Sequence, residues 1–110
     1  MEPNKTKILV VEDEAILLTA LSEELKIKGF EVIGAHDGME GLEQTKSEQP
    51  DLILLDLNLP KKDGREVLAE IKADVQLKRI PVVVLSTSNA DEDVFKVYDL
   101  HGNCFITKPV

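Results

Sequence analysis

The sequence predicts an α/β domain built on a parallel sheet with helices on both faces. Five short runs rich in Val, Ile and Leu alternate with longer stretches whose apolar residues recur at helical spacing. Each expected strand leads directly into an expected helix, and the connections between them are short. Strands joined through helices pair in parallel, and their crossovers share one hand. The alternation therefore predicts a doubly wound, five-stranded parallel sheet.

The apolar runs give the expected positions of the strands. These are Lys7–Val11, Glu31–Ala35, Leu52–Leu55, Val82–Leu85 and Cys104–Thr107. The first run has apolar side chains on both faces, which is typical of a strand buried between two helical layers. Pro81 precedes the fourth run and marks where it begins, since proline is tolerated at the start of a strand.

The stretches between the strands predict four helices. The first is expected from Glu14 to Gly29, because a leucine stripe recurs at helical spacing and Gly29 provides a stop. That stripe comprises Leu17, Leu18, Leu21 and Leu25. Asp37 is the expected N-cap of the second helix, in which Met39 is expected in or near the core. The third helix is marked by Val67, Leu68 and Ile71, and the fourth is expected near Asp91 to His101.

Length and charge limit what the chain can do. Its 110 residues make about one domain, expected to span 1–110, and leave no room for a second catalytic or DNA-binding unit. A net charge of −8 argues against direct contact with nucleic acid, which needs clustered Lys and Arg. The start of the chain lacks the apolar stretch of a signal peptide, and no apolar run reaches membrane-spanning length. With Cys104 as its single cysteine, the chain is expected to be cytoplasmic.

Polar residues follow the carboxyl ends of the strands, the edge at which doubly wound sheets bind ligands. They are Glu12 and Asp13 after the first strand, Asp56 after the third, Ser86 after the fourth, and Thr107-Lys108-Pro109 after the fifth. Crowded carboxylates repel one another, and a hard cation with oxygen ligands relieves that repulsion. We therefore expect a Mg²⁺ site, with Mn²⁺ as an alternative ion.

A carboxylate beside such a cation can act as a nucleophile toward phosphorus. Asp56 is the best candidate, because it follows the central strand. Lys108 can approach as a point charge, and the Ser86 hydroxyl can donate a hydrogen bond to a phosphoryl oxygen.

Each of these residues also has a purely structural interpretation. Glu12 and Asp13 can serve as charges at a helix N-terminus, and Asp56 as a turn residue. Ser86 can cap a helix, and Lys108 can be solvated. Their expected convergence on one edge of the sheet favours the functional interpretation.

Several motifs, in this order and spacing, resemble those of the receiver domains of bacterial response regulators. They are Val11-Glu12-Asp13-Glu14, Leu55-Asp56-Leu57-Asn58-Leu59-Pro60, Asp63-Gly64, Pro81-Val82-Val83-Val84-Leu85-Ser86 and Lys108-Pro109. The resemblance covers nearly the whole chain. It implies a flavodoxin-like sheet with strand order 2-1-3-4-5.

The resemblance also implies roles for individual residues. Asp56 would accept a phosphoryl group from a histidine kinase in a Mg²⁺-dependent reaction, and Ser86 and Lys108 would bind that group. The metal would be held by Glu12, Asp13, Asp56 and the backbone carbonyl of Asn58. Phe105 would be the aromatic switch that follows Ser86, and the Lys108–Pro109 peptide would be cis.

The second half of the chain is similar to the small regulators paired with cyanobacterial phytochromes. This similarity rests on Leu85-Ser86-Thr87-Ser88, Tyr98-Asp99-Leu100-His101 and Asn103-Cys104-Phe105-Ile106-Thr107-Lys108. It implies a phytochrome-type sensor kinase as the partner.

The sequence departs from the family at its end, because it stops at Val110 where the family continues into a fifth helix. Without this C-terminal helix, apolar surface would be exposed, and we expect self-association through that face. Glu12 stands where Asp is commoner, and Ser86 where Thr is commoner.

The leading hypothesis is a signalling switch that takes part in its own phosphoryl transfer and slow dephosphorylation, rather than a metabolic enzyme. The alternative is an interaction module that is not phosphorylated, or a receiver fragment that folds by dimerisation or swapping. A phosphatase with an aspartyl-phosphate intermediate would need a second acid where Asn58 stands. Nucleotide binding is not favoured, because the sequence has no glycine-rich phosphate-binding loop.

Overall fold

A parallel sheet forms the centre of the molecule in the computed structural model, which describes residues 5–86 and 104–107. Its strands are β1 Lys7–Val11, β2 Glu31–Ala35, β3 Leu52–Asp56, β4 Val82–Ser86 and β5 Cys104–Thr107. They lie in the order β2-β1-β3-β4-β5, and every neighbouring pair is parallel. The predicted fold class and strand order are therefore confirmed.

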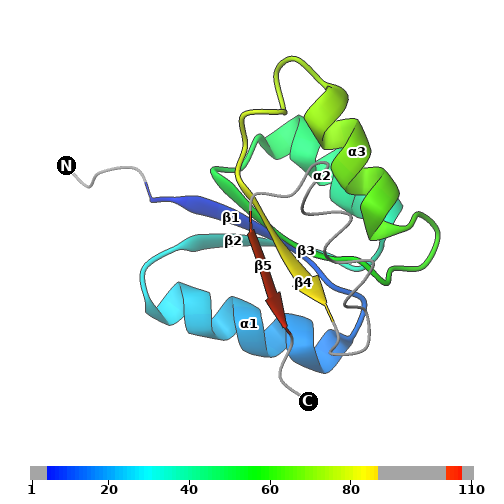
Figure 1. Cartoon of the computed structure of the whole chain (residues 1–110). Helices are drawn as coiled ribbons and strands as arrows, with labels where there is room; N and C mark the ends of the chain where they lie inside the picture. The colour runs from blue at the N-terminus through cyan, green and yellow to red at the C-terminus, as the bar shows by residue number, and fades with distance from the viewer. Residues whose placement is uncertain (1–4, 87–103, 108–110) are drawn as a thin grey trace.

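Helices cover both faces of the sheet, as Figure 1 shows. They are α1 Ala15–Ile27, α2 Gly38–Glu48 and α3 Gly64–Ala73. Helix α1 packs on one face against β1 and β2, and α2 and α3 lie together on the other face. The fourth helix expected near 91–101 lies outside the described residues.

The alternation of β1 divides the core into two layers. Ile8 and Val10 pack with Leu18 on the α1 side. Leu9 and Val11 point to the opposite side and pack in the larger cluster beneath α2 and α3, which includes Ile71. Each such side chain, when fully buried, contributes about 1.5–3 kcal/mol to folding. A strand that is apolar on both faces thus supplies both layers at once.

Local signals set the helix ends. At the end of α1, the N–H of Gly29 donates to the Lys26 carbonyl and the N–H of Phe30 donates to the Leu25 carbonyl, at 3.0 and 3.1 Å. This is a Schellman motif, and it needs the positive φ of 97° that Gly29 adopts. At the start of α2, the Asp37 carboxylate accepts a 2.8 Å hydrogen bond from the Glu40 N–H. The predicted stop and the predicted N-cap are both confirmed.

None of the helices in the described part of the chain combines the length and the apolar character that crossing a bilayer requires.

Candidate functional site

Three carboxylates meet at the carboxyl edge of the sheet. Glu12 and Asp13 follow β1, and Asp56 is the last residue of β3. The two strands are neighbours in register, with Val11 opposite Leu55, so Glu12 and Asp56, each one residue further along, lie side by side. One oxygen from each of the three side chains lies within 4.8 Å of the others. The structure therefore brings together the three acids that the strand ends predict.

Two of these carboxylates are buried. Glu12 is 0% exposed and Asp56 is 1% exposed, whereas Asp13 is open to solvent. Backbone groups that follow each acid orient it: the Glu14 N–H donates to Glu12 Oε2 at 3.1 Å, and the Asn58 N–H donates to Asp56 Oδ1 at 3.1 Å. Burying negative charge is costly unless it is compensated. The site thus holds three carboxyl groups in a fixed arrangement, and Asp13 lies on the side that is open to water.

The donor set of this cluster fits a hard divalent cation. All three side chains offer carboxylate oxygens, which Mg²⁺ and Mn²⁺ prefer over nitrogen or sulfur ligands. The exposure of Asp13 leaves a side on which water can complete the coordination of an ion, as Mg²⁺ usually requires. Glu12, Asp13 and Asp56 are therefore the side chains in the described part of the chain that suit such an ion.

For most of the other predicted site residues, the structure gives the position of the backbone. Asn58 lies two residues beyond Asp56 and is exposed. Ser86 ends β4, where it pairs with Thr107, and Phe105 pairs with Val84 in β5. The pairing of Asp56 with Leu85 puts Ser86 one residue beyond, at the same edge of the sheet. Lys108 and the predicted cis peptide before Pro109 lie outside the described residues.

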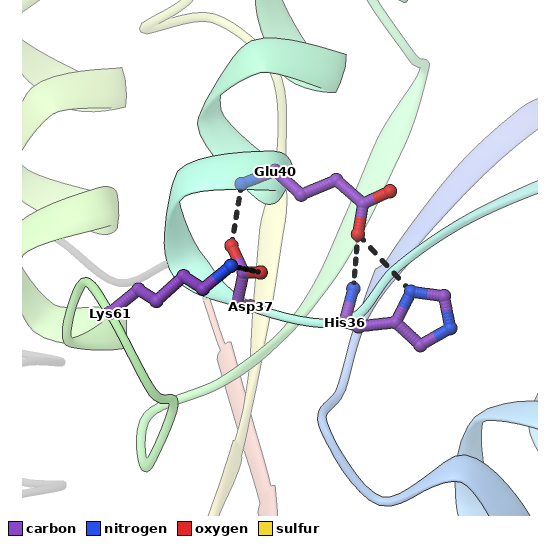
Figure 2. A network of polar contacts seen from close by, with 4 residues as sticks. All are labelled: His36, Asp37, Glu40 and Lys61. Carbon is purple, nitrogen blue, oxygen red and sulfur yellow. Dashed lines mark hydrogen bonds and ion pairs between the residues drawn. The ribbon is translucent and has the colours of Figure 1, made fainter.

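A polar network beside this edge was not predicted from the sequence. Figure 2 shows Lys61, from the loop between β3 and α3, reaching the Asp37 carboxylate, with 3.4 Å between Nζ and Oδ2. On the other side, Glu40 Oε1 accepts a hydrogen bond from the His36 N–H at 2.7 Å and lies 3.2 Å from the His36 ring Nδ1. The spacing Asp37-x-x-Glu40 is a variant of the capping box, a local signal that could have revealed half of the network.

Charge around the network shifts two pKa values. The Glu40 N–H, which donates to Asp37, lowers the pKa of that carboxyl, and the nearby Lys61 lowers it further. The ion pair and hydrogen bond with Glu70 raise the pKa of Lys62. Both groups are therefore held in their charged forms at neutral pH.

Comparison with known proteins identifies this arrangement. The family model described as the response regulator receiver domain matches residues 8–110. The chain belongs to the response regulator receiver domain family. Receiver domains are signalling switches of two-component systems rather than metabolic enzymes. The predicted family is confirmed.

Similar proteins include two response regulators, one of which is a cyanobacterial phytochrome response regulator. Response regulator Rcp1 of Synechocystis sp. (strain ATCC 27184 / PCC 6803 / Kazusa) is 50% identical, over 97% of this receiver domain and 80% of Rcp1. The crystal structure of the phosphorylated cyanobacterial phytochrome response regulator RcpA has a TM-score of 0.87 and 53% identity, over 97% of this chain and 83% of that one. The predicted likeness to phytochrome regulators is therefore confirmed.

A further solved structure, the Mn²⁺-bound form of response regulator Rcp1, has a TM-score of 0.83 and 50% identity, over 94% of this chain and 81% of that chain. That protein holds a divalent cation, and the acidic cluster of this receiver domain fits the same class of ion.

Proposed function

We propose that this receiver domain accepts a phosphoryl group on Asp56 from a histidine kinase in a Mg²⁺-dependent reaction. The observation that carries the proposal is the position of Asp56: it ends the central strand, is 1% exposed, and shares a compact cluster with Glu12 and Asp13. The phosphorylated form of RcpA, a protein 53% identical to this chain, adds support.

The reaction is a phosphoryl transfer between two side chains. A carboxylate oxygen of Asp56 forms a bond to phosphorus while the phosphorus–nitrogen bond of the kinase phosphohistidine breaks, and the imidazole nitrogen keeps the electron pair. Glu12, Asp13, Asp56 and the Asn58 carbonyl would hold Mg²⁺ or Mn²⁺. When bound, the ion neutralises charge on the phosphoryl oxygens. Oxygen-only donors and the Mn²⁺-bound form of Rcp1 support this assignment.

The remaining roles follow from the matching motifs. Ser86 and Lys108 bind the phosphoryl group, and Ser86 passes its presence to Phe105 as a change of conformation. The backbone register supports the first part, because Ser86 follows the partner of Asp56 on the neighbouring strand. Slow hydrolysis of the aspartyl phosphate within the receiver domain itself is part of the proposal, and the exposure of Asn58, two residues beyond Asp56, supports access of water to that side.

The partner we propose is a sensor kinase of the phytochrome type in the cytoplasm. The support is the similarity to Rcp1 and RcpA, the second of which is described as a phytochrome response regulator. We also propose that the receiver domain spans 1–110, and the family match to residues 8–110 supports this extent.

The test is the intact mass of the full chain after incubation with Mg²⁺ and acetyl phosphate. We expect a single phosphoryl adduct that requires Mg²⁺ and is absent from Asp56→Asn. The matched control is Asp51→Asn, which makes the same change at the opposite end of β3, where Asp51 accepts a hydrogen bond from the Lys7 N–H. An unmodified but folded wild type would contradict the proposal and favour the interaction module.

A further inference from the structure

The loop that follows Asp56 is held from both of its ends. We define the β3–α3 loop as residues 57–63. Its first residue, Leu57, is 0% exposed and anchors the loop in the core. At its far end, the Gly64 N–H donates to the Leu57 carbonyl at 2.9 Å. A Cβ on Gly64 would lie 2.2 Å from the Asp56 carbonyl oxygen, so the two ends approach as closely as only glycine allows.

The middle of this loop rests on the first turn of α2. The Gly38 N–H donates to the Pro60 carbonyl at 3.4 Å. A Cβ built on Gly38 would lie 1.8 Å from the Lys62 carbonyl oxygen, which is backbone and cannot rotate away. The loop therefore occupies the space that any other residue at position 38 would fill.

Two lysines fix the loop in this position. Lys61 adopts a φ of 67°, which residues with side chains rarely adopt, and its Nζ lies 3.4 Å from Asp37 Oδ2 (Figure 2). The Lys62 side chain is only 20% exposed and forms an ion pair with Glu70 of α3. The loop backbone is thus held between α2 and α3.

The acidic cluster depends on the same loop. The Asn58 N–H donates to Asp56 Oδ1 at 3.1 Å, so a shift of the loop turns the carboxylate of the phosphoacceptor. The Asn58 carbonyl, which we assign to the metal, moves with it. Partners that orient ligands from outside a metal site typically change its affinity by about 10–100-fold when they are mutated.

We propose that the start of α2 is a positioning element for the metal site: Gly38, by admitting the Lys62 carbonyl, sets the place of the β3–α3 loop and hence the divalent-cation affinity of the acidic cluster. The inference rests on the proposed function, because it takes the cluster and the Asn58 carbonyl to be the metal ligands. It adds an element that contributes no ligand of its own.

The test is Mn²⁺ titration of the full chain, followed by the electron paramagnetic resonance signal of free Mn²⁺. Gly38→Ala should weaken Mn²⁺ binding about tenfold or more. The matched control is Gly34→Ala, where the nearest atoms to the added Cβ belong to the Leu18 side chain, at an ordinary 3.5 Å. Thermal unfolding of each variant, with titration well below its midpoint, ensures that only folded protein is compared.

A second pair of variants keeps the test informative if Gly38→Ala does not fold. Lys61→Gly and Lys61→Val both remove the ion pair with Asp37, but only valine opposes the positive φ. Lys61→Val should therefore bind Mn²⁺ more weakly than Lys61→Gly. Equal affinities in this pair would overturn the proposal.

Phosphorylation by acetyl phosphate gives an independent readout. In Gly38→Ala the half-saturating Mg²⁺ concentration should rise by about the same factor as the Mn²⁺ affinity falls, with a smaller change in rate at saturating Mg²⁺. If wild-type protein bound no Mn²⁺, this result would contradict both the metal site and the proposed function. Wild-type binding together with equal affinities in Gly38→Ala and Gly34→Ala would leave that function intact and refute the positioning role.

Discussion

Asp56→Asn should stabilise the metal-free protein, because it removes one of three crowded carboxylates. Their nearest oxygens lie within 4.8 Å of one another. Two unit charges at that separation repel by about 3 kcal/mol at an effective dielectric constant of about 20, and by under about 1 kcal/mol in bulk water. Water screens the exposed Asp13, so the buried pair of Glu12 and Asp56 dominates. We expect a gain of about 1–3 kcal/mol.

The substitution is nearly isosteric, and an asparagine oxygen can still accept the hydrogen bond that the Asn58 N–H donates to Asp56. Urea unfolding at pH 7.5, followed by circular dichroism, would measure the gain in the presence of a chelator. With Mg²⁺ at about 100 times its Kd, the free energy of unfolding of wild type should rise by about 2.7 kcal/mol. The difference in stability between Asp56→Asn and wild type should therefore narrow.

The control for this experiment is again Asp51→Asn, which removes one negative charge far from the cluster. It should change the stability little, and its response to Mg²⁺ should match that of wild type. The reasoning would be refuted if Asp56→Asn were no more stable than wild type without metal, since the carboxylates would then not repel appreciably.

Three further outcomes follow from packing and charge. Ile71→Ala, at a side chain that is 0% exposed, should lower the free energy of unfolding by about 2–5 kcal/mol, whereas Ile16→Ala, at a side chain that is 87% exposed, should change it by under about 0.5 kcal/mol. Urea unfolding would measure both variants, and equal losses would contradict the two-layer core. Because the pKa of Asp37 is lowered from 3.8, the ionised carboxylate should contribute to stability above pH 3.8, and this contribution should be lost as the pH falls through the lowered pKa. Acid unfolding should therefore show wild type as more stable than Asp37→Asn above that range, with the two stability curves converging only as the pH falls through the lowered pKa. Leu52 and Leu54, half-buried on the α1 side of the sheet, predict concentration-dependent self-association, which sedimentation equilibrium would detect; a monomer at every concentration would count against it.

The sheet was predictable because its strands are buried on both faces. The apolar runs gave each strand to within a residue, and β3 and β4 each extend one residue further, to Asp56 and Ser86. The meeting of Glu12, Asp13 and Asp56 was also predictable, since the carboxyl ends of parallel strands share one edge. These features depend only on local patterns and on the rules of strand connection.

Features that depend on long-range fit were not predictable. Met39 was expected in or near the core, and that prediction was wrong: its side chain is 49% exposed. The buried face of α2 is built instead from small residues, Gly38 and Gly41, with Leu42 and Thr45. The positive φ of Lys61 accompanies a tight turn in which the Lys62 N–H donates to the Pro60 carbonyl at 2.7 Å, and a lysine gives no sign of that conformation.

The close approach of Gly38 to the Lys62 carbonyl also restricts how such a sequence can change over time. A side chain can be accommodated at position 38 only if the segment 57–63 changes its length or path. If a longer segment followed another path, the steric requirement for glycine at this position would disappear. A change at position 38 is therefore coupled to a segment more than twenty positions further along the chain. Substitution of Gly38 would have to be accompanied by a change in segment 57–63, whereas a change in that segment would leave the glycine tolerated.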